Sequence, residues 1–231
     1  MKIIGCTGVA RSGKDTYCGI AMEILNRNGI SSKKYSFADE LKREVAGFLQ
    51  EKCGVDVWTN ITELKTDIRD FLVWYGTTFW RKRDPEKWIK IVNDSIEKDN
   101  GFIDVGFISD VRYPNEGDWI HNKSGKLIHI SSYKLETTYE FDYALHPELD
   151  GVEHPEQYFD DYIEIPIKRY LGGANTEERN CDPILRNNSD FKVEWETRGL
   201  TPVDAINHND FRIKVLNSLN ASNLFTEKLS L

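Results

Sequence analysis

The sequence has no excess of basic charge, no cysteine framework and no long apolar run. With 38 acidic against 30 basic side chains, the 231-residue chain has a formal net charge of −8, which argues against sequence-independent neutralisation of a long nucleic acid. Its four cysteines form no C-x-x-C pair and match no histidine spacing, so neither a zinc site nor a disulfide framework is indicated. No stretch approaches the roughly 18 to 20 apolar residues that span a bilayer, and the first ten residues lack the layout of a signal peptide. We therefore expect a cytoplasmic protein without a membrane or a stable nucleic-acid partner.

Several kinds of site are also missing. There is no Ser-His-Asp or Cys-His set at a defensible spacing, no domain-sized repeat and no low-complexity segment. Two "HPE" triplets, at 146–148 and 154–156, suggest a metal site, but nothing fixes their histidines at ligand spacing. A homodimer is compatible with the sequence.

Short apolar segments alternate with amphipathic ones along the chain. Strands are expected at 2–7, 33–38, 101–110, 126–132 and 162–167, and helices at 15–29, 39–54, 62–83, 84–98 and 201–219. Asp84 is the expected cap of the helix that starts there, and the tail after the last helix is expected to be disposable. This alternation predicts one α/β domain over 1–231, with three α/β/α layers and a mostly parallel sheet of about five strands. A helical substrate-binding insertion is expected at about 40–98, and an irregular flap or insertion at about 171–200.

The stretch "GVARSGKDT" at 8–16 lies between the first strand and the first helix. Its glycines allow the backbone N–H groups to turn inward around a phosphate, with the positive end of the helix behind them, and Lys14 then reaches the β and γ phosphates of ATP. A surface glycine turn is the alternative, but strand, glycines, lysine and helix occur in the required order. The expected nucleotide-binding residues are Gly8, Ala10, Arg11, Ser12, Gly13, Lys14, Asp15 and Thr16.

Asp15 occupies the position where the usual loop has a magnesium-binding hydroxyl, which here comes one residue later, at Thr16. A carboxylate at a helix N-terminus is favourable and can hold Mg²⁺ directly or through water. Asp110 ends the apolar segment at 101–110, the strongest strand candidate, and is the second expected carboxylate for the metal, although an aspartate that caps its own turn is the alternative reading. The expected metal site is thus Asp15, Thr16 and Asp110.

Basic and aromatic residues supply a candidate acceptor site. Arg112 and Glu116 follow the strand that ends at Asp110, and the helix at 62–83 contains arginines among aromatic residues that could hold an anion beside a base. Glycine within that helix, at Gly76, favours a close approach by a ligand or a neighbouring backbone. The expected substrate-binding residues are Lys42, Arg69, Trp74, Arg81, Arg112 and Glu116.

Four stretches together resemble the phage-type deoxynucleoside monophosphate kinases: "GVARSGKDT", "YSFADELK", "FLVWYGTTFWRKRDPEKWI" and "ISDVRYPNE". They span about residues 3–130, and the pattern weakens beyond residue 145. The resemblance implies a P-loop kinase fold that moves the γ-phosphate of ATP to a nucleoside monophosphate with Mg²⁺, in phage DNA precursor synthesis and hence in the host cytoplasm. It implies catalytic roles for Lys14, Arg81, Arg112 and Asp110.

Two alternatives stay open at this point. One keeps the kinase but changes the acceptor to a modified base in DNA or to another small molecule. The other is a nucleotide-binding switch or assembly protein that transfers no phosphate to a small molecule. Clustering of Arg69, Arg81 and Arg112 opposite Lys14 would favour the kinase.

Overall fold

The computed structural model describes residues 1–141, 162–197 and 202–231. The "HPE" triplets lie outside these residues. The strands are β1 (Lys2–Thr7), β2 (Ser32–Tyr35), β3 (Val105–Val111), β4 (Lys126–Phe141), β5 (Tyr162–Tyr170) and β6 (Phe191–Glu196). The helices are α1 (Lys14–Arg27), α2 (Phe37–Cys53), α3 (Thr62–Val73), the π-helix η1 (Trp74–Arg81), α4 (Lys87–Asp99), α5 (Pro114–Asn122), α6 (Thr176–Asn188), α7 (Pro202–Asn207) and α8 (Asn209–Ala221).

The described strands form one six-stranded sheet, one strand more than expected. Its order is β2-β3-β1-β4-β5, and β6 pairs with β4 beside this path. All pairings are parallel except that of β4 with β5. Because neighbouring parallel strands end at the same edge, the segments after β1, β2 and β3 meet there, which brings the glycine loop, the start of α2 and Arg112 together.

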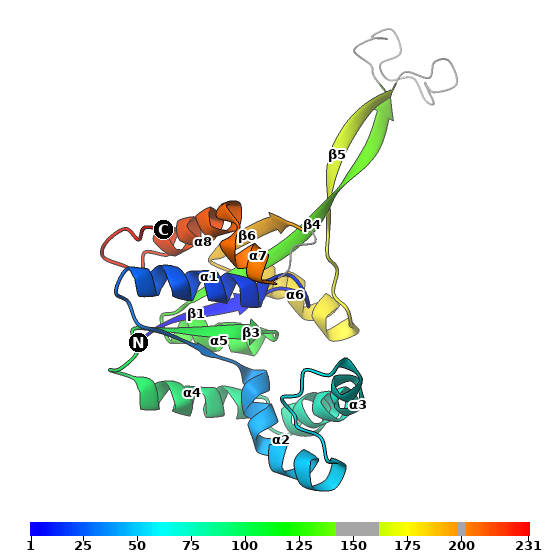
Figure 1. The fold of residues 1–231 in the computed structure, drawn as a ribbon, viewed down its shortest axis with the longest axis vertical. Helices are drawn as coiled ribbons and strands as arrows, with labels where there is room; N and C mark the ends of the chain where they lie inside the picture. The colour runs from blue at the N-terminus through cyan, green and yellow to red at the C-terminus, as the bar shows by residue number, and fades with distance from the viewer. Residues whose placement is uncertain (142–161, 198–201) are drawn as a thin grey trace.

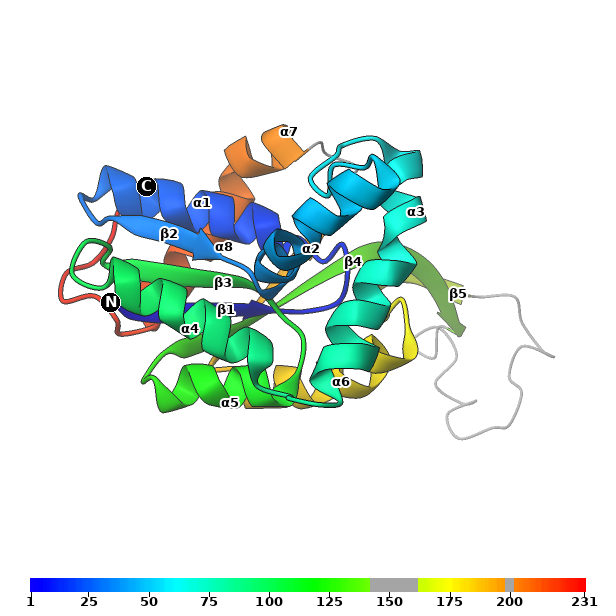
Figure 2. The same ribbon diagram turned by 90° about the horizontal axis from the view of Figure 1, so that it is seen from below.

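Helices cover both faces of this sheet, which gives the predicted three layers (Figures 1 and 2). Alternate residues of β1 point to opposite faces: Ile4 packs in the cluster that contains α1 and α8, and Ile3 packs in the cluster with α4 and α5. Both clusters consist of buried aliphatic and aromatic side chains, the pattern expected of parallel strands covered on both sides. The fold is therefore α/β with a mostly parallel central sheet.

The predicted helix at 62–83 is divided between α3 and η1, and the next helix begins at Lys87 rather than at Asp84. Asp84 Oδ1 instead accepts the N–H of Glu86 in the turn before α4. Trp88 Nε1 donates to the carbonyl of Gly76 over 3.1 Å and so fastens the π-helix to α4. The close approach expected at Gly76 comes from a side chain, since a Cβ there would lie 2.2 Å from Leu41 Cδ1.

The expectation of irregular structure over 171–200 is wrong for its central part. Residues 176–188 form α6, which begins where the side chain of Asn175 accepts the N–H of Glu178, and "FKVEW" lies in β6. The polar composition and Pro183 conceal the helix in the sequence, because only Leu185 of α6 is buried.

The C-terminal region also differs from the expectation. The single helix predicted at 201–219 is divided into α7 and α8, and its expected first residue, Thr201, lies outside the described residues. The tail is not disposable: Leu229 is buried in the cluster around α1, and its N–H donates to Asn220 Oδ1 over 2.8 Å.

The antiparallel pair β4 and β5 projects from the body as an arm (Figure 1). Large apolar side chains on it are exposed, among them Leu135, Tyr139 and Ile167. No helix of the described residues is long and apolar enough to cross a membrane.

Candidate active site

The loop between β1 and α1 is held against the edge of the sheet, and glycine is required at both of its ends. Gly8 has φ +134°, and a Cβ there would lie 2.1 Å from the carbonyl oxygen of Ile130. Gly13 has φ +94°, and a Cβ there would lie 2.4 Å from the ring of Trp195, whose Nε1 donates to the carbonyl of Ser12 over 2.9 Å. The backbone path of the loop is thus fixed by β4 and β6 as well as by its own sequence.

Lys14 lies at the first position of α1 and folds over the loop. Its Nζ donates to the carbonyl oxygens of Gly8 and Val9 over 2.6 and 2.8 Å. Burial lowers the pKa of Lys14, and the positive charge of Arg112 lowers it further. Asp15 follows with its side chain 83 % exposed and pairs with Lys34 over 3.2 Å.

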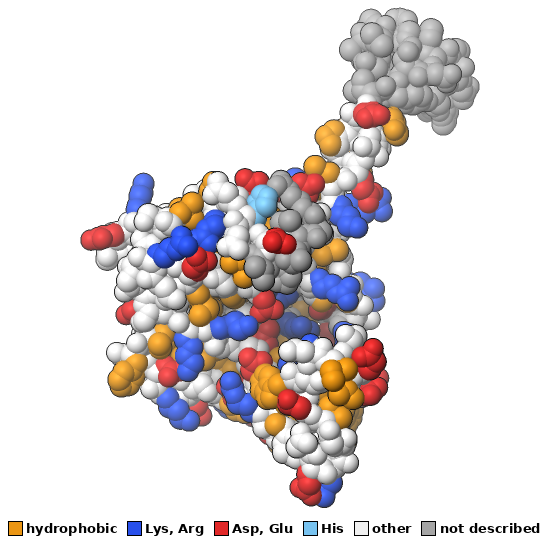
Figure 3. Space-filling model, in the orientation of Figure 1, with side chains coloured by type: hydrophobic (Ala, Val, Ile, Leu, Met, Phe, Trp, Pro, Cys, Tyr) orange, Lys and Arg blue, Asp and Glu red, His pale blue; other side chains and the backbone are white. Residues whose placement is uncertain are grey.

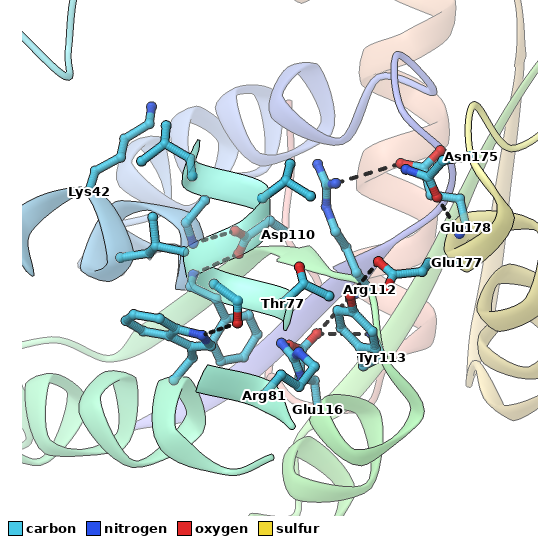
Figure 4. Close-up of a pocket in the computed structure, with 17 residues that line it drawn as sticks. Lys42, Thr77, Arg81, Asp110, Arg112, Tyr113, Glu116, Asn175, Glu177 and Glu178 are labelled. Carbon is cyan, nitrogen blue, oxygen red and sulfur yellow. Dashed lines mark hydrogen bonds and ion pairs between the residues drawn. The ribbon is translucent and has the colours of Figure 1, made fainter. Parts of the chain in front are cut away.

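A cavity of about 220 Å³ lies between the carboxyl edge of the sheet, the helices α2, α3 and η1 and the start of α6 (Figure 4), and its lining residue Glu178 contacts the loop at the N–H of Ala10. One side is apolar, and the other contains charged groups that point inward, from Arg81, Arg112 and several carboxylates. Its lining residues are Phe37, Ala38, Leu41, Lys42, Leu72, Val73, Gly76, Thr77, Arg81, Trp88, Asp110, Arg112, Tyr113, Glu116, Asn175, Glu177 and Glu178.

Glu116 organises the arginine side of this cavity. Its side chain is 1 % exposed; Oε1 accepts from Arg81 Nη2 over 2.6 Å, and Oε2 accepts the N–H of Arg112 and of Tyr113 over 2.7 and 3.0 Å. The guanidinium of Arg81 also lies 3.6 Å from the centre of the Tyr113 ring. Burial raises the pKa of Glu116, and Arg81 partly offsets this. Glu116, predicted to bind substrate, therefore positions both arginine segments.

Arg112 points across the cavity toward α6, with its Nη1 3.6 Å from Glu178 Oε1. The other oxygen of Glu178 accepts the N–H of Ala10, in the glycine loop, over 3.4 Å, and that of Ala174 over 2.9 Å. Glu178 was not predicted from the sequence. Its only local signal is the spacing Asn175-x-x-Glu178, which is typical of a helix start.

Asp110 lies at the same edge, but its oxygens already have donors. They accept from Ser36 Oγ and from the N–H groups of Phe37 and Ala38, each over 2.9 Å. Burial raises the pKa of Asp110, and these three donors counteract it. The carboxylate thus binds the N-terminus of α2; its metal role stays a prediction.

The structure brings together only part of the predicted substrate site. Lys42, Arg81, Arg112 and Glu116 line the cavity, whereas Arg69 and Trp74 do not. Arg69 is exposed on α3, and Trp74 is 48 % exposed and contacts the rings of neighbouring aromatic residues. Along a helix, residues three to four apart share a face. Arg69 is therefore on the same face as the lining residues Leu72 and Val73, but it lies one turn before them and does not line the cavity.

Charge on the outer surface is mixed. On the face in Figure 3, Lys and Arg side chains alternate with acidic ones and form no continuous basic stripe. Among residues 1–141, 162–197 and 202–231, no three His, Cys, Asp or Glu side chains are grouped so as to hold a metal ion.

Comparison with known proteins adds little beyond this geometry. No protein-family model and no curated protein matches the chain. Among solved structures, dephospho-CoA kinase from Campylobacter jejuni is similar, with a TM-score of 0.43 and 15 % sequence identity over 95 % of this chain and 96 % of that one. A likeness of this size does not carry over a substrate or a mechanism.

Proposed function

We propose that the protein is a Mg²⁺-dependent kinase that transfers the γ-phosphate of ATP to a (deoxy)nucleoside 5′-monophosphate and gives the diphosphate. The observation that carries the proposal is the position of the cavity with Arg81 and Arg112, which adjoins the glycine loop. Arg112 is close enough to Lys14 to lower its pKa, and Glu178 contacts both Arg112 and the loop. These contacts support a donor site at the loop with an anion-binding acceptor site beside it.

The proposed acceptor site has a charged side and an apolar side, which suit the phosphate and the nucleoside of a nucleotide. The guanidinium groups of Arg81 and Arg112 match the geometry of a phosphate, whereas Lys42, which also lines the cavity, has its ammonium 4.8 Å from the centre of the Trp58 ring. The apolar side, which includes Phe37 and Leu41, offers a surface for the base and the sugar. An apolar surface of this kind would not be needed to bind phosphate alone.

The chemistry requires alignment and charge neutralisation more than a covalent intermediate. An oxygen of the acceptor phosphate forms a bond to the γ-phosphorus, and the bond from that phosphorus to the β–γ bridging oxygen breaks, which releases ADP. Lys14 and the N–H groups of the loop would stabilise the transferring group. The arginines would hold the acceptor in line and offset the negative charge of the two reactants.

The residues at the start of α1 fit a magnesium ion better than Asp110 does. Asp15 is exposed and its partner Lys34 is a surface lysine, so its oxygens are accessible, and the hydroxyl of Thr16 lies in the same turn. Mg²⁺ in such sites is held by substrate phosphates and one or two protein oxygens. When bound, it would neutralise phosphate charge.

The biological setting we infer is the synthesis of DNA precursors in a phage-infected cell. The support is the sequence resemblance described above, together with a cavity that two of its segments, "YSFADELK" and "ISDVRYPNE", line from two sides. The same resemblance is the basis for expecting host cytoplasm as the location.

The test is a panel assay. The purified protein is incubated with ATP, Mg²⁺ and each common ribo- and deoxyribonucleoside monophosphate, and both ADP and the diphosphate are quantified. We expect equal amounts of the two products for at least one acceptor. The Lys14→Ala variant should fold as judged by circular dichroism and lose turnover. ATP binding without phosphorylation of any monophosphate would contradict the proposal.

A further inference from the structure

The carboxylate of Glu178 lies where the glycine loop faces the arginine side of the cavity. Its two oxygens contact the N–H of Ala10 in the loop and the guanidinium of Arg112, and its negative charge also acts on Lys14. The side chain is only 10 % exposed. An N–H of a phosphate loop, an arginine and a nearby lysine are the partners that a phosphate group takes. The carboxylate of Glu178 therefore contacts groups that would otherwise be available to a bound phosphate.

The first turn of α6, which carries Glu178, makes few contacts with the body, whereas its later turns are held by the buried Leu185 and by the contact of Asp182 with His129. Apart from those of Glu178, the hydrogen bond from Tyr113 Oη to Glu177 Oε2, 2.8 Å long, is the contact that ties the first turn of α6 to the cavity. Gly172 precedes the helix with open space where a side chain would be, and the residues around it are mostly exposed. A glycine next to a helix start can absorb a change in backbone direction.

We propose that Glu178 competes with the phosphate chain of the nucleotide for Ala10 and Arg112, so that triphosphate binding displaces Glu178 and releases the first turn of α6. The inference builds on the proposed function only in taking a triphosphate as the ligand of the loop. Glu178 then acts as a specificity-determining residue. A ligand with several charged phosphates can replace its interactions, whereas a small monoanion gains too little to do so.

The apparent affinity for a triphosphate then depends on the fraction of molecules in which Glu178 has left Ala10 and Arg112. When one internal group closes a site, the apparent dissociation constant equals the intrinsic one divided by the open fraction. Glu178→Gln keeps the shape of the side chain and one acceptor oxygen for the N–H groups, but it removes the charge that pairs with Arg112. The variant should therefore bind a triphosphate more tightly.

The first measurement is calorimetric binding of inorganic tripolyphosphate without Mg²⁺. We expect Glu178→Gln to bind it roughly five- to tenfold more tightly than the unaltered protein. Glu227→Gln is the charge-matched control, because Glu227 lies in a separate surface hollow with Lys2, at the opposite end of β1 from the loop. The control should stay within about twofold of the unaltered protein. Equal or weaker binding by Glu178→Gln would overturn the proposal.

The second measurement separates displacement from a simple change in local charge. Hydrogen exchange is followed in the peptide over 172–179, where Ala174 N–H donates to Glu178 and Glu178 N–H donates to Asn175. Tripolyphosphate should speed exchange at Ala174 in the unaltered protein, and in Glu178→Gln, which keeps an acceptor oxygen for that N–H, it should do so at a lower tripolyphosphate concentration. Tighter binding with no change in exchange would mean that Glu178 stays in place, and it would also overturn the proposal. If tripolyphosphate behaves as expected but no monophosphate is phosphorylated, the displacement stands and the proposed function fails.

Discussion

Replacement of Glu116 by alanine tests how the arginine side of the site is built. Glu116 and Arg81 form an ion pair of 2.6 Å, with side chains 1 % and 15 % exposed. Loss of one partner from a buried pair costs about 3 to 5 kcal/mol. Since some water reaches Arg81, we expect the lower end, about 3 kcal/mol of unfolding free energy. For a chain of this length that corresponds to a fall in melting temperature of roughly 6 to 12 °C.

Urea unfolding followed by tryptophan fluorescence measures this loss. The control is Asp118→Asn, which changes an exposed charge on the same helix and should alter stability by less than about 0.5 kcal/mol. Glu116→Gln retains an oxygen for the N–H groups of Arg112 and Tyr113. Its unfolding free energy should therefore fall by about 1 kcal/mol less than that of the alanine variant. The acceptor KM should rise in both, because Arg81 loses its orienting partner. A loss below about 1 kcal/mol for Glu116→Ala would refute the reasoning.

Three further predictions concern the loop and the cavity. Burial lowers the pKa of Lys14, and its protonated form is the one that binds phosphate, so kcat/KM for ATP should begin to fall at a lower alkaline pH than an ordinary lysine would give. Lys14→Arg should be slower but should show no such alkaline fall, because arginine stays protonated. The same alkaline fall in both enzymes would contradict this. Gly76→Ala would place a Cβ against Leu41, which lines the cavity, so the acceptor KM should rise several-fold more than that for ATP in steady-state assays. Gly13→Ala, at φ +94° and against Trp195, should destabilise the fold by more than about 1 kcal/mol in thermal melts and weaken ATP binding, whereas an unchanged melting temperature would show that the loop can adapt.

The sheet and its order of elements could be predicted because local patterns determine them. The strand at 2–7 and the helix predicted at 15–29 are found with the predicted bounds to within two residues, since an apolar run, a glycine turn and an amphipathic stripe each act over a few residues. The loop was predictable for the same reason. Its support by Trp195, 183 residues from Ser12, was not.

The site was predictable in part, and the two failures have different causes. Arg81 and Arg112 were selected by residue type and do line the cavity. Trp74 was selected in the same way, but it is 48 % exposed and does not line the cavity, since residue type alone does not decide which way a helical side chain points. Glu178 was missed because it belongs to a polar helix whose contacts with the loop are entirely non-local.

The most direct test of the central claim is identification of the product by phosphorus NMR, with ATP, Mg²⁺ and the best monophosphate of the panel. The account predicts ADP together with a nucleoside diphosphate whose two phosphorus resonances couple to each other, because the acceptor atom is a phosphate oxygen. Inorganic phosphate alone, or a new phosphate ester on a hydroxyl group, would contradict it.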